Sequence, residues 1–583
     1  MILKMKNVTI PVLAAVVFAL SSCQKQYETQ PLAQQLTLDY AFNPKDSAGA
    51  LALSFLSTCY LEALPNGHNR VNGDYLDAAS DDAVSNKLTV SQVQQIATGA
   101  YSAASPNGDD EWERNYFAIR DCNIFINEIY RVPLAEKLPN GQPAISAYRS
   151  EARFLRAWLY FELVKRYGGV PLLGDTVFSI TSNVQVPRNN FSDCINYIVS
   201  ECDNIKDSLR TVAMLTSTNY GRATQGAALA LKADALLLAA SPLYNGGNID
   251  PQNPLTGYTS YDATRWQSAA QAAQDVINSG IYSLMSNFEN VFTTQAQPIG
   301  TNTESIFWVQ VGSNNSVEQV NSPIGYSSAG AQGNTGPTQN LVDAFPTDSG
   351  YAITDSGSGY DANSPYTNRD PRLAATVFCN GTSFWLNRAV QTYDGGLDKP
   401  GGSVVQTKTG YYMRKFMGPW ESVTGTPQFG STFHDFIYFR YADILLDFAE
   451  ATNEFTGPST AVYNVLFELR KRAGIFPGAS GYYGLPANMD QPTMRAAIQN
   501  ERRIEMAFEE KRYWDIRRWK IAAAAYNTAP LAGMDIQQPT NQPLIYNRVP
   551  VLTTSFKDPS MYLYPIPYGE VVKNPQMRQN PGW

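Results

Sequence analysis

The segment that most constrains the fold lies near the end of the chain, at residues 497–520. It carries twelve charged residues between Glu501 and Lys520, and neither glycine nor proline interrupts it. Apolar residues recur in it at helical spacings, so the pattern predicts one long amphipathic helix. Opposite charges three or four positions apart would support this helix along its surface, in the pairs Arg502/Glu505, Glu509/Arg512, Lys511/Asp515 and Asp515/Arg518.

The aromatic residues of the same segment indicate that the helix is buried. A run of charges alone is typical of a solvated helix face. Rings distributed around a helix are costly to leave in water, and this segment contains Phe508, Tyr513, Trp514 and Trp519. We therefore predict a helix that packs between other helices, with its arginines paired to their carboxylates.

Composition limits the classes of partner. At 583 residues and 44% hydrophobic, the chain is long enough to bury a large core. The net charge of -8 and the pI near 5.1 argue against nucleic acid as a partner, because phosphate binding needs a basic surface. Charged residues make up only 16%, so the surface depends on neutral polar side chains. This composition suits a protein outside the cytoplasm or one that handles neutral polar ligands.

The first residues predict export. Lys4 and Lys6 precede an apolar run, which is the pattern of a signal peptide. The run is short for a membrane span, so residues 1–22 are predicted to be a signal peptide. Small residues directly before Cys23 resemble the lipobox of bacterial lipoproteins, so Cys23 is the candidate lipidation site. An ordinary signal peptide with an incidental cysteine is the alternative. The polar residues 23–36 are predicted to be a tether.

Cysteine and histidine usage argues against a metal centre. Five cysteines follow Cys23, without a CxxC pair, which indicates neither a disulfide framework nor a zinc site. Four of them lie in helical patterns and are expected to be small buried hydrophobes: Cys59, Cys122, Cys194 and Cys202. His68 and His434 are the only histidines, which leaves little room for a histidine metal site or a Ser-His-Asp device. No catalytic residue, cofactor or metal is predicted, although Asp-rich loops could hold a structural Ca²⁺.

The chain divides into two helical regions around an irregular one. Residues 37–292 are predicted to be an N-terminal region of helix pairs of the tetratricopeptide type. Residues 293–436 are dense in Gly, Ser, Thr, Asn and Pro, with short strand-like pieces, and are predicted to be a loop-rich insertion. Helix returns in residues 437–583. Helices are expected at 47–64, 109–131, 145–167, 190–209, 224–240, 262–279, 438–453 and 460–473.

Several segments together resemble one family. The lipobox-like Cys23 is followed, in order, by characteristic sequences at 150–173, 337–345, 369–373, 439–454, 500–520 and 564–583. In this combination the chain resembles the SusD/RagB family of outer-membrane lipoproteins of Bacteroidota, over nearly its whole mature length. The resemblance implies a mainly α fold, a SusD-like α-α superhelix of tetratricopeptide-like helix pairs, with a loop-rich, mixed α/β subdomain.

The resemblance also implies a function. Such proteins are held at the outer membrane by a lipid anchor, exposed at the cell surface, where they capture oligosaccharides and deliver them to a SusC-like TonB-dependent transporter. Some members of the family resemble RagB and take peptides instead. The sequence leaves both ligand classes open.

A glycan site needs aromatic faces for sugar C–H groups and planar polar groups for hydroxyls. The resemblance places ligand residues before the second large helix and in loops after the strand that ends near residue 310. The candidates on this basis are Tyr101, Asn107, Trp112, Asn314, Asn315 and Tyr326, with Trp385 and Trp420 in the same loop-rich region. Each of the aromatic candidates could equally pack inside the protein, Trp112 in the core of its helix.

The sequence also bears on two other function classes, an enzyme and a structural scaffold. Asp81 with Asp82, the acidic run 109–111 and Asp343 could supply the two carboxyl groups of a glycoside hydrolase. Proximity in sequence does not establish that geometry, and the run 109–111 suits the first turn of a helix. No P-loop, GxSxG or HExxH pattern occurs, so we predict a binding protein and not an enzyme. A purely structural scaffold would share the helical frame but would not need loops rich in aromatic residues and asparagine.

Overall fold

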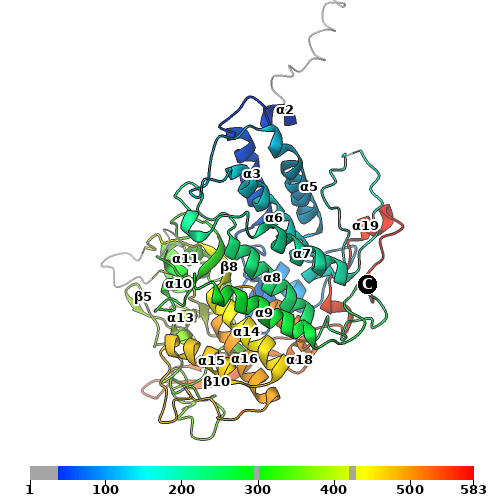
Figure 1. Cartoon of the computed structure of the whole chain (residues 1–583). Coiled ribbons are helices and arrows are strands. Elements are labelled where there is room, and N and C mark those ends of the chain that lie inside the picture. The colour runs from blue at the N-terminus through cyan, green and yellow to red at the C-terminus, as the bar shows by residue number, and fades with distance from the viewer. Residues whose placement is uncertain (1–36, 180, 295–300, 419–427) are drawn as a thin grey trace, which may run out of the picture.

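The computed structural model describes residues 37–179, 181–294, 301–418 and 428–583. The predicted signal peptide, the tether, Cys23 and Trp420 lie outside these residues. The fold is mainly helical, with small sheets, as the sequence predicts (Figure 1). No helix in the described ranges combines the length and the apolar character that crossing a membrane requires.

The N-terminal region is a row of helices in which each packs against the next along the chain. The six long helices are α3 (Ala50–Ala63), α5 (Trp112–Glu128), α6 (Ala144–Tyr167), α7 (Phe191–Ile205), α8 (Gln225–Ala240) and α9 (Thr264–Asn278). The short helices α2 (Leu38–Ala41), α4 (Gln92–Ala97) and α10 (Asn290–Thr293) lie between or beside them. These helices confirm the helical ranges predicted for this region.

Helix α6 lies at the centre of this row. Most of its residues are buried, on every side of the helix, which is the pattern of a helix surrounded by others. It ends at Gly168, whose φ of 76° is a conformation that glycine adopts without strain. The predicted burial of Cys59, Cys122, Cys194 and Cys202 is confirmed, and all four are free thiols.

The C-terminal region continues the helical frame. Helix α14 (Tyr441–Thr456) packs against α8 and α9 of the N-terminal region, and also against α15 (Thr460–Ala473) and α16 (Gln491–Glu505). Thus α14 joins the two regions into one body (Figure 1). The remaining helices here are α17 (Arg512–Arg518), α18 (Ala522–Asn527) and α19 (Tyr568–Lys573).

The prediction of a single helix over 497–520 is wrong, because α16 ends at Glu505 and α17 begins at Arg512. Between them, Phe508 and Glu510 have φ values of 64° and 58°. Their backbone N–H groups donate to the two carboxylate oxygens of Asp77, over 3.1 and 3.3 Å, instead of to helical carbonyls. A tertiary contact from a residue more than 400 positions away therefore overrides the local helix propensity.

The predicted pairing between helices is confirmed. Arg502 donates to Asp443 and Asp447 of α14, each over 2.8 Å, and Arg518 donates to Glu450 of the same helix. Of the pairs predicted within the segment, Asp515 with Arg518 is present at 2.8 Å. The four aromatic residues of the segment are buried, as predicted.

Short antiparallel pairs of strands lie within the loop-rich region, between it and the two helical regions, and within the C-terminal region. The pairs are β1 (Ala83–Ser85) with β3 (Thr335–Pro337), β2 (Ser305–Val309) with β8 (Phe436–Arg440), β4 (Val377–Phe378) with β7 (Tyr412–Met413), β5 (Phe384–Trp385) with β6 (Arg388–Ala389), and β9 (Leu531–Gln537) with β10 (Ile545–Leu552). Short helices α11 (Ser316–Asn321), α12 (Gln339–Ala344) and α13 (Pro371–Thr376) lie among them. Residues 438–440, predicted as the start of a helix, belong to β8 because they pair with β2.

Candidate functional site

The structure does not bring the predicted ligand residues into one place. Helix α11 and strand β5, which carry or adjoin the candidates of the loop-rich region, lie at the left of the molecule, whereas α19 lies at the right (Figure 1). Trp112, the first residue of α5, lines a groove together with residues of α19. The two predicted groups therefore belong to different surfaces.

In the loop-rich region, the two aromatic candidates that the structure describes are covered. Tyr326 is 1% exposed, its hydroxyl donates to the carbonyl of Trp385 over 2.6 Å, and the guanidinium of Arg388 lies 4.2 Å from the ring centre. Trp385 is also 1% exposed and packs against Phe378. Because neither ring presents a face to solvent, stacking on a ligand would require this cluster to open.

The side chains of the two asparagine candidates form hydrogen bonds with the backbone of nearby loops. The side-chain oxygen of Asn314 accepts from the backbone N–H of Ser316 over 2.9 Å, and Asn315 donates to the carbonyl of Phe429 over 3.4 Å. Both are half-buried. Their structural bonds leave part of each amide accessible, so a ligand role for Asn314 and Asn315 stays a prediction.

In the N-terminal group, all three candidates have structural partners. Tyr101 is 6% exposed, and its ring lies 5.1 Å from that of Trp583. Asn107 is buried and accepts from the backbone N–H of Asp109 over 2.8 Å, which stabilises the turn before α5. Only Trp112 of this group borders an open cavity.

This cavity, which we call the α5 groove, has a volume of about 580 Å³, within the usual range for ligand sites. It lies between α5, the described residues of the loop 171–186 (171–179 and 181–186) and the C-terminal segment 567–577, which includes α19. Its lining residues are Pro106, Asp110, Trp112, Glu113, Tyr116, Phe117, Arg120, Pro171, Leu173, Thr176, Phe178, Val184, Val186, Pro567, Glu570, Lys573, Asn574 and Met577.

One side of the groove is aromatic. Trp112 and Tyr116 lie about one helical turn apart on α5, Phe117 lies about 100° further around the helix, and all three line the groove. The rings of Trp112 and Tyr116 lie 5.1 Å apart, and Trp112 is 5% exposed. Phe117 is 56% exposed, so it offers a ring face to a ligand.

The loop opposite is fixed to α5 by a row of side chains. Tyr116, Arg120, Asn123 and Asn127 follow one another at spacings of four, three and four, which places them along one helix face. They donate to the loop carbonyls of Pro171 (2.9 Å), Phe178 (3.4 Å), Thr176 (3.0 Å) and Asp175 (2.9 Å), respectively. This side of the groove is thus held in place without a ligand.

On the third side of the groove, hydrogen bonds join the loop to the C-terminal segment. Asn574 donates to the carbonyl of Val186 over 2.9 Å, and Gln576 donates to that of Gln185 over 3.1 Å. Arg188 donates to the carbonyl of Arg578 over 2.9 Å. All three sides of the groove are therefore preorganised, which lowers the entropy cost of binding.

Burial shifts the pKa of two titratable groups of the groove. Burial raises the pKa of Tyr116 well above its ordinary value, so this phenol stays neutral near pH 7. Burial also raises the pKa of Asp110, while a hydrogen bond from Tyr167 opposes that shift. No group of His, Cys, Asp and Glu within the described ranges could hold a metal ion. The groove can offer stacking and a few hydrogen bonds.

The carboxylates considered for hydrolysis are held in ion pairs. Asp82 pairs with Arg503 at 2.6 Å, and Asp81 pairs with Arg512 at 2.8 Å. Asp109 is fully buried and pairs with Arg166 at 2.9 Å. Arg166 and Arg70 lower the pKa of Asp109 below its ordinary value in spite of burial, and Arg503 and Arg512 do the same for Asp81. The arrangement explains the acidic residues as parts of the buried charge network.

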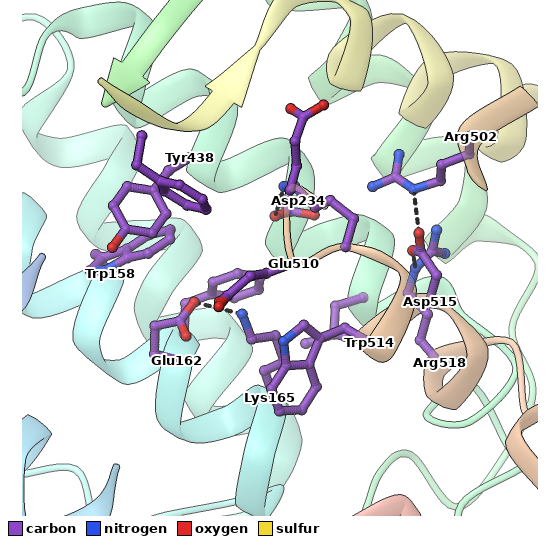
Figure 2. Close-up of a pocket in the computed structure, with 15 residues that line it drawn as sticks. Trp158, Glu162, Lys165, Asp234, Tyr438, Arg502, Glu510, Trp514, Asp515 and Arg518 are labelled. Atoms are coloured by element: carbon purple, nitrogen blue, oxygen red, sulfur yellow. Dashed lines mark hydrogen bonds and ion pairs between the residues drawn. The ribbon is translucent and has the colours of Figure 1, made fainter. Parts of the chain in front are cut away.

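A second cavity is too small for a sugar. It has a volume of about 70 Å³ and lies between α6, α8 and α17. Figure 2 shows Lys165 and Glu162 pointing toward one another beside Trp514, with a separation of 2.7 Å between the charged groups. Since one water occupies roughly 30 Å³, this cavity has room for about two waters. We assign it to the packing of the charge network.

Sequence analysis identified Trp112 but missed Tyr116 and Phe117. Their spacing on α5 is visible in the sequence, but the same spacing is typical of a core-facing stripe. The facing segments 171–186 and 567–577 carry no motif that indicates a shared groove. Only the tertiary fold brings the three segments together.

Comparison with known proteins gives the family. The model of the SusD family matches residues 289–583, and a second model, described as starch-binding associating with outer membrane, matches residues 54–237. A SusD-like protein of Formosa agariphila is 24% identical over 541 residues, covering 88% of this chain and 91% of the relative.

Solved structures agree in fold over almost the whole chain. A SusD-like protein from Bacteroides fragilis has a TM-score of 0.73 at 28% identity, covering 92% of this chain and 98% of that one. A SusD-like carbohydrate binding protein from the same species has a TM-score of 0.68 at 23% identity, covering 91% and 99%. The helical frame, the order of the motifs and these matches lead to one conclusion: the chain belongs to the SusD/RagB family.

Proposed function

We propose that this protein captures oligosaccharides at the cell surface and passes them to a SusC-like TonB-dependent transporter. The family membership supports this role, as do the description of the matching model as starch-binding and the carbohydrate binding assigned to one structural neighbour. A lipid on Cys23 would anchor the protein in the outer membrane. The protein would bind its ligand without cleaving it.

The observation that carries the proposal is the exposed aromatic side of the α5 groove. Pyranose rings present apolar C–H faces that stack on aromatic rings, and Phe117 offers such a ring beside Trp112 and Tyr116. Polar side chains at the rim, Glu113 and Lys573, are exposed and can reach ligand hydroxyls. An open groove of this kind buries little of a ligand, so the affinity for one short glycan should be modest.

Calorimetric titration tests the proposal. The purified chain is titrated with neutral plant, fungal and host oligosaccharides, and with mixed oligopeptides in parallel. We expect binding of one glycan class, and about a 10-fold weaker affinity for the Phe117→Ala variant, because its stacking contact is lost. Phe476→Ala is the matched control, since Phe476 is 59% exposed and does not line the groove.

The outcomes separate the two ligand classes. Unchanged glycan affinity in Phe117→Ala would exclude the α5 groove as the site. Heat with peptides alone would assign the protein to the peptide-capturing branch of the family instead.

A further inference from the structure

We infer that the α5 groove selects glycans poor in hydroxyl groups, such as 6-deoxy, O-acetylated or O-methylated sugars, and that it prefers neutral ones. This inference rests on the proposed function and narrows the class of ligand. It follows from three properties of the groove: an aliphatic wall, polar groups below the rim that already have partners, and compensated charges.

The wall that faces the aromatic side is aliphatic. Leu173, Val184 and Val186 come from the loop 171–186, and Met577 comes from the C-terminal segment. None of these side chains can donate or accept a strong hydrogen bond. Val184 is 39% exposed, so its methyl groups are accessible to a ligand. A sugar held between Phe117 and this wall would contact apolar surface on both sides.

Polar groups deeper in the groove are already used by the protein. The hydroxyl of Tyr116 donates to the carbonyl of Pro171. The amide of Asn574 donates to Val186 and accepts from the backbone N–H of Gln576 over 3.0 Å. A ligand hydroxyl that turned toward these groups would leave water without gaining a full partner. The loss of such a hydrogen bond weakens binding by a factor of roughly 5 to 100.

Methyl and acetyl groups suit the same surface. A methyl group buried against the aliphatic wall removes apolar area from water and gains about 4-fold in affinity. A 6-deoxy sugar carries a methyl group where its parent hexose carries a hydroxymethyl group. The groove should therefore distinguish two sugars that differ by a single oxygen atom.

Charges around the groove nearly cancel. Lys573 lies 3.5 Å from Glu570, and Arg120 lies 3.6 Å from Asp121. The lining contains three carboxylates, on Asp110, Glu113 and Glu570, and two cationic side chains, on Arg120 and Lys573. This small negative excess disfavours uronate and sulfate groups, because no cationic side chain of the lining is left without a nearby counter-charge.

Matched sugar pairs test the inference by ligand-observed NMR titration of the purified chain. The pairs are methyl α-L-fucoside with methyl α-L-galactoside, and methyl α-L-rhamnoside with methyl α-L-mannoside, each differing only in the oxygen at C6. Acetylated xylo-oligosaccharides are compared with their deacetylated forms, and galacturonate oligomers with their methyl esters. We expect at least 5-fold tighter binding of the deoxy, acetylated or esterified member.

The Val184→Thr variant tests whether the preference for hydroxyl-poor sugars arises at the aliphatic wall. Val184→Thr keeps the shape of the side chain but adds a hydroxyl group to the wall, so the preference for the deoxy sugar should fall by about 3-fold or more. Val90→Thr is the control, since Val90 is 63% exposed and lies outside the groove.

Failure of the inference differs from failure of the proposed function. Equal affinities within the pairs would overturn the hydroxyl-poor preference and leave glycan capture intact. An unchanged preference in Val184→Thr would overturn the assignment to this wall. Binding of peptides but of no glycan would overturn both.

Discussion

At the scale of single residues, the stability of this protein depends on buried ion pairs. Glu505, at the end of α16, is fully buried and accepts from Arg440 over 2.8 Å, from Arg372 over 2.9 Å and from Arg472. Burial alone would raise the pKa of Glu505, but these arginines lower it well below the ordinary value. Three elements far apart in the sequence therefore meet at one carboxylate.

Replacing Glu505 by Gln should destabilise the protein by about 2–3 kcal/mol, because the substitution removes a charged hydrogen-bond acceptor from three buried arginines, each of which keeps another carboxylate. Urea denaturation followed by circular dichroism measures the loss. Glu113→Gln, at an exposed position of α5, is the matched control and should change the free energy of unfolding by less than about 0.5 kcal/mol. A loss as small as that of the control would contradict the role assigned to the buried pairs.

The burial of His68 predicts a dependence of stability on pH. His68 is buried beside Tyr75, His434, Phe416 and Phe436. Burial lowers its pKa to about 3, and the nearby His434 acts in the same direction. Because an unfolded histidine titrates near 6.5, the unfolded chain binds more protons than the folded one between about pH 6.5 and 3. Stability should fall as the pH is lowered through this window.

The contribution of His68 should amount to about 2 kcal/mol between pH 7 and pH 5, at roughly 1.4 kcal/mol for each pH unit below 6.5. Urea titrations at both pH values measure it. His68→Gln, which cannot be protonated, should lose this part of the pH dependence while retaining the rest. The same pH dependence in the wild-type chain and in His68→Gln would show that His68 is not the group responsible.

At the scale of elements, propensity and periodicity in the sequence predicted the long helices, because each has a continuous apolar face or a clear terminating residue. The break between α16 and α17 was not predicted, because its cause, the carboxylate of Asp77, lies far away in sequence. The aromatic content of the segment did indicate burial, which the structure confirms. Local patterns thus predict that an element is buried better than they predict where it ends.

The end of α17 offers a test of backbone strain. Lys520 follows the C-cap residue Trp519, is exposed and has a φ of 62°, a conformation that costs little only for glycine. Lys520→Gly should stabilise the protein by about 0.5–1 kcal/mol, measured by urea denaturation. Lys520→Ala retains the strain and is the control, so an equal gain in both variants would exclude relief of backbone strain as the cause.

At the scale of the whole molecule, the helical frame positions a groove that no single segment encodes. The family resemblance predicted the helical frame, but it placed most candidate residues in a region where Tyr326 and Trp385 are covered. The α5 groove depends on contacts among residues 112–120, 171–186 and 567–577. Those contacts join distant parts of the chain. For this reason, Trp112 alone among the described sequence candidates lines the groove.

The central claim is that the α5 groove is where a glycan binds. A crystal structure of the chain, grown with the oligosaccharide that shows the strongest heat of binding, tests this most directly. The account predicts sugar density in the groove, with one ring stacked on Phe117 and its apolar substituents turned toward Val184. Density instead at the loops around Asn314 and Tyr326, with an empty α5 groove, would contradict it.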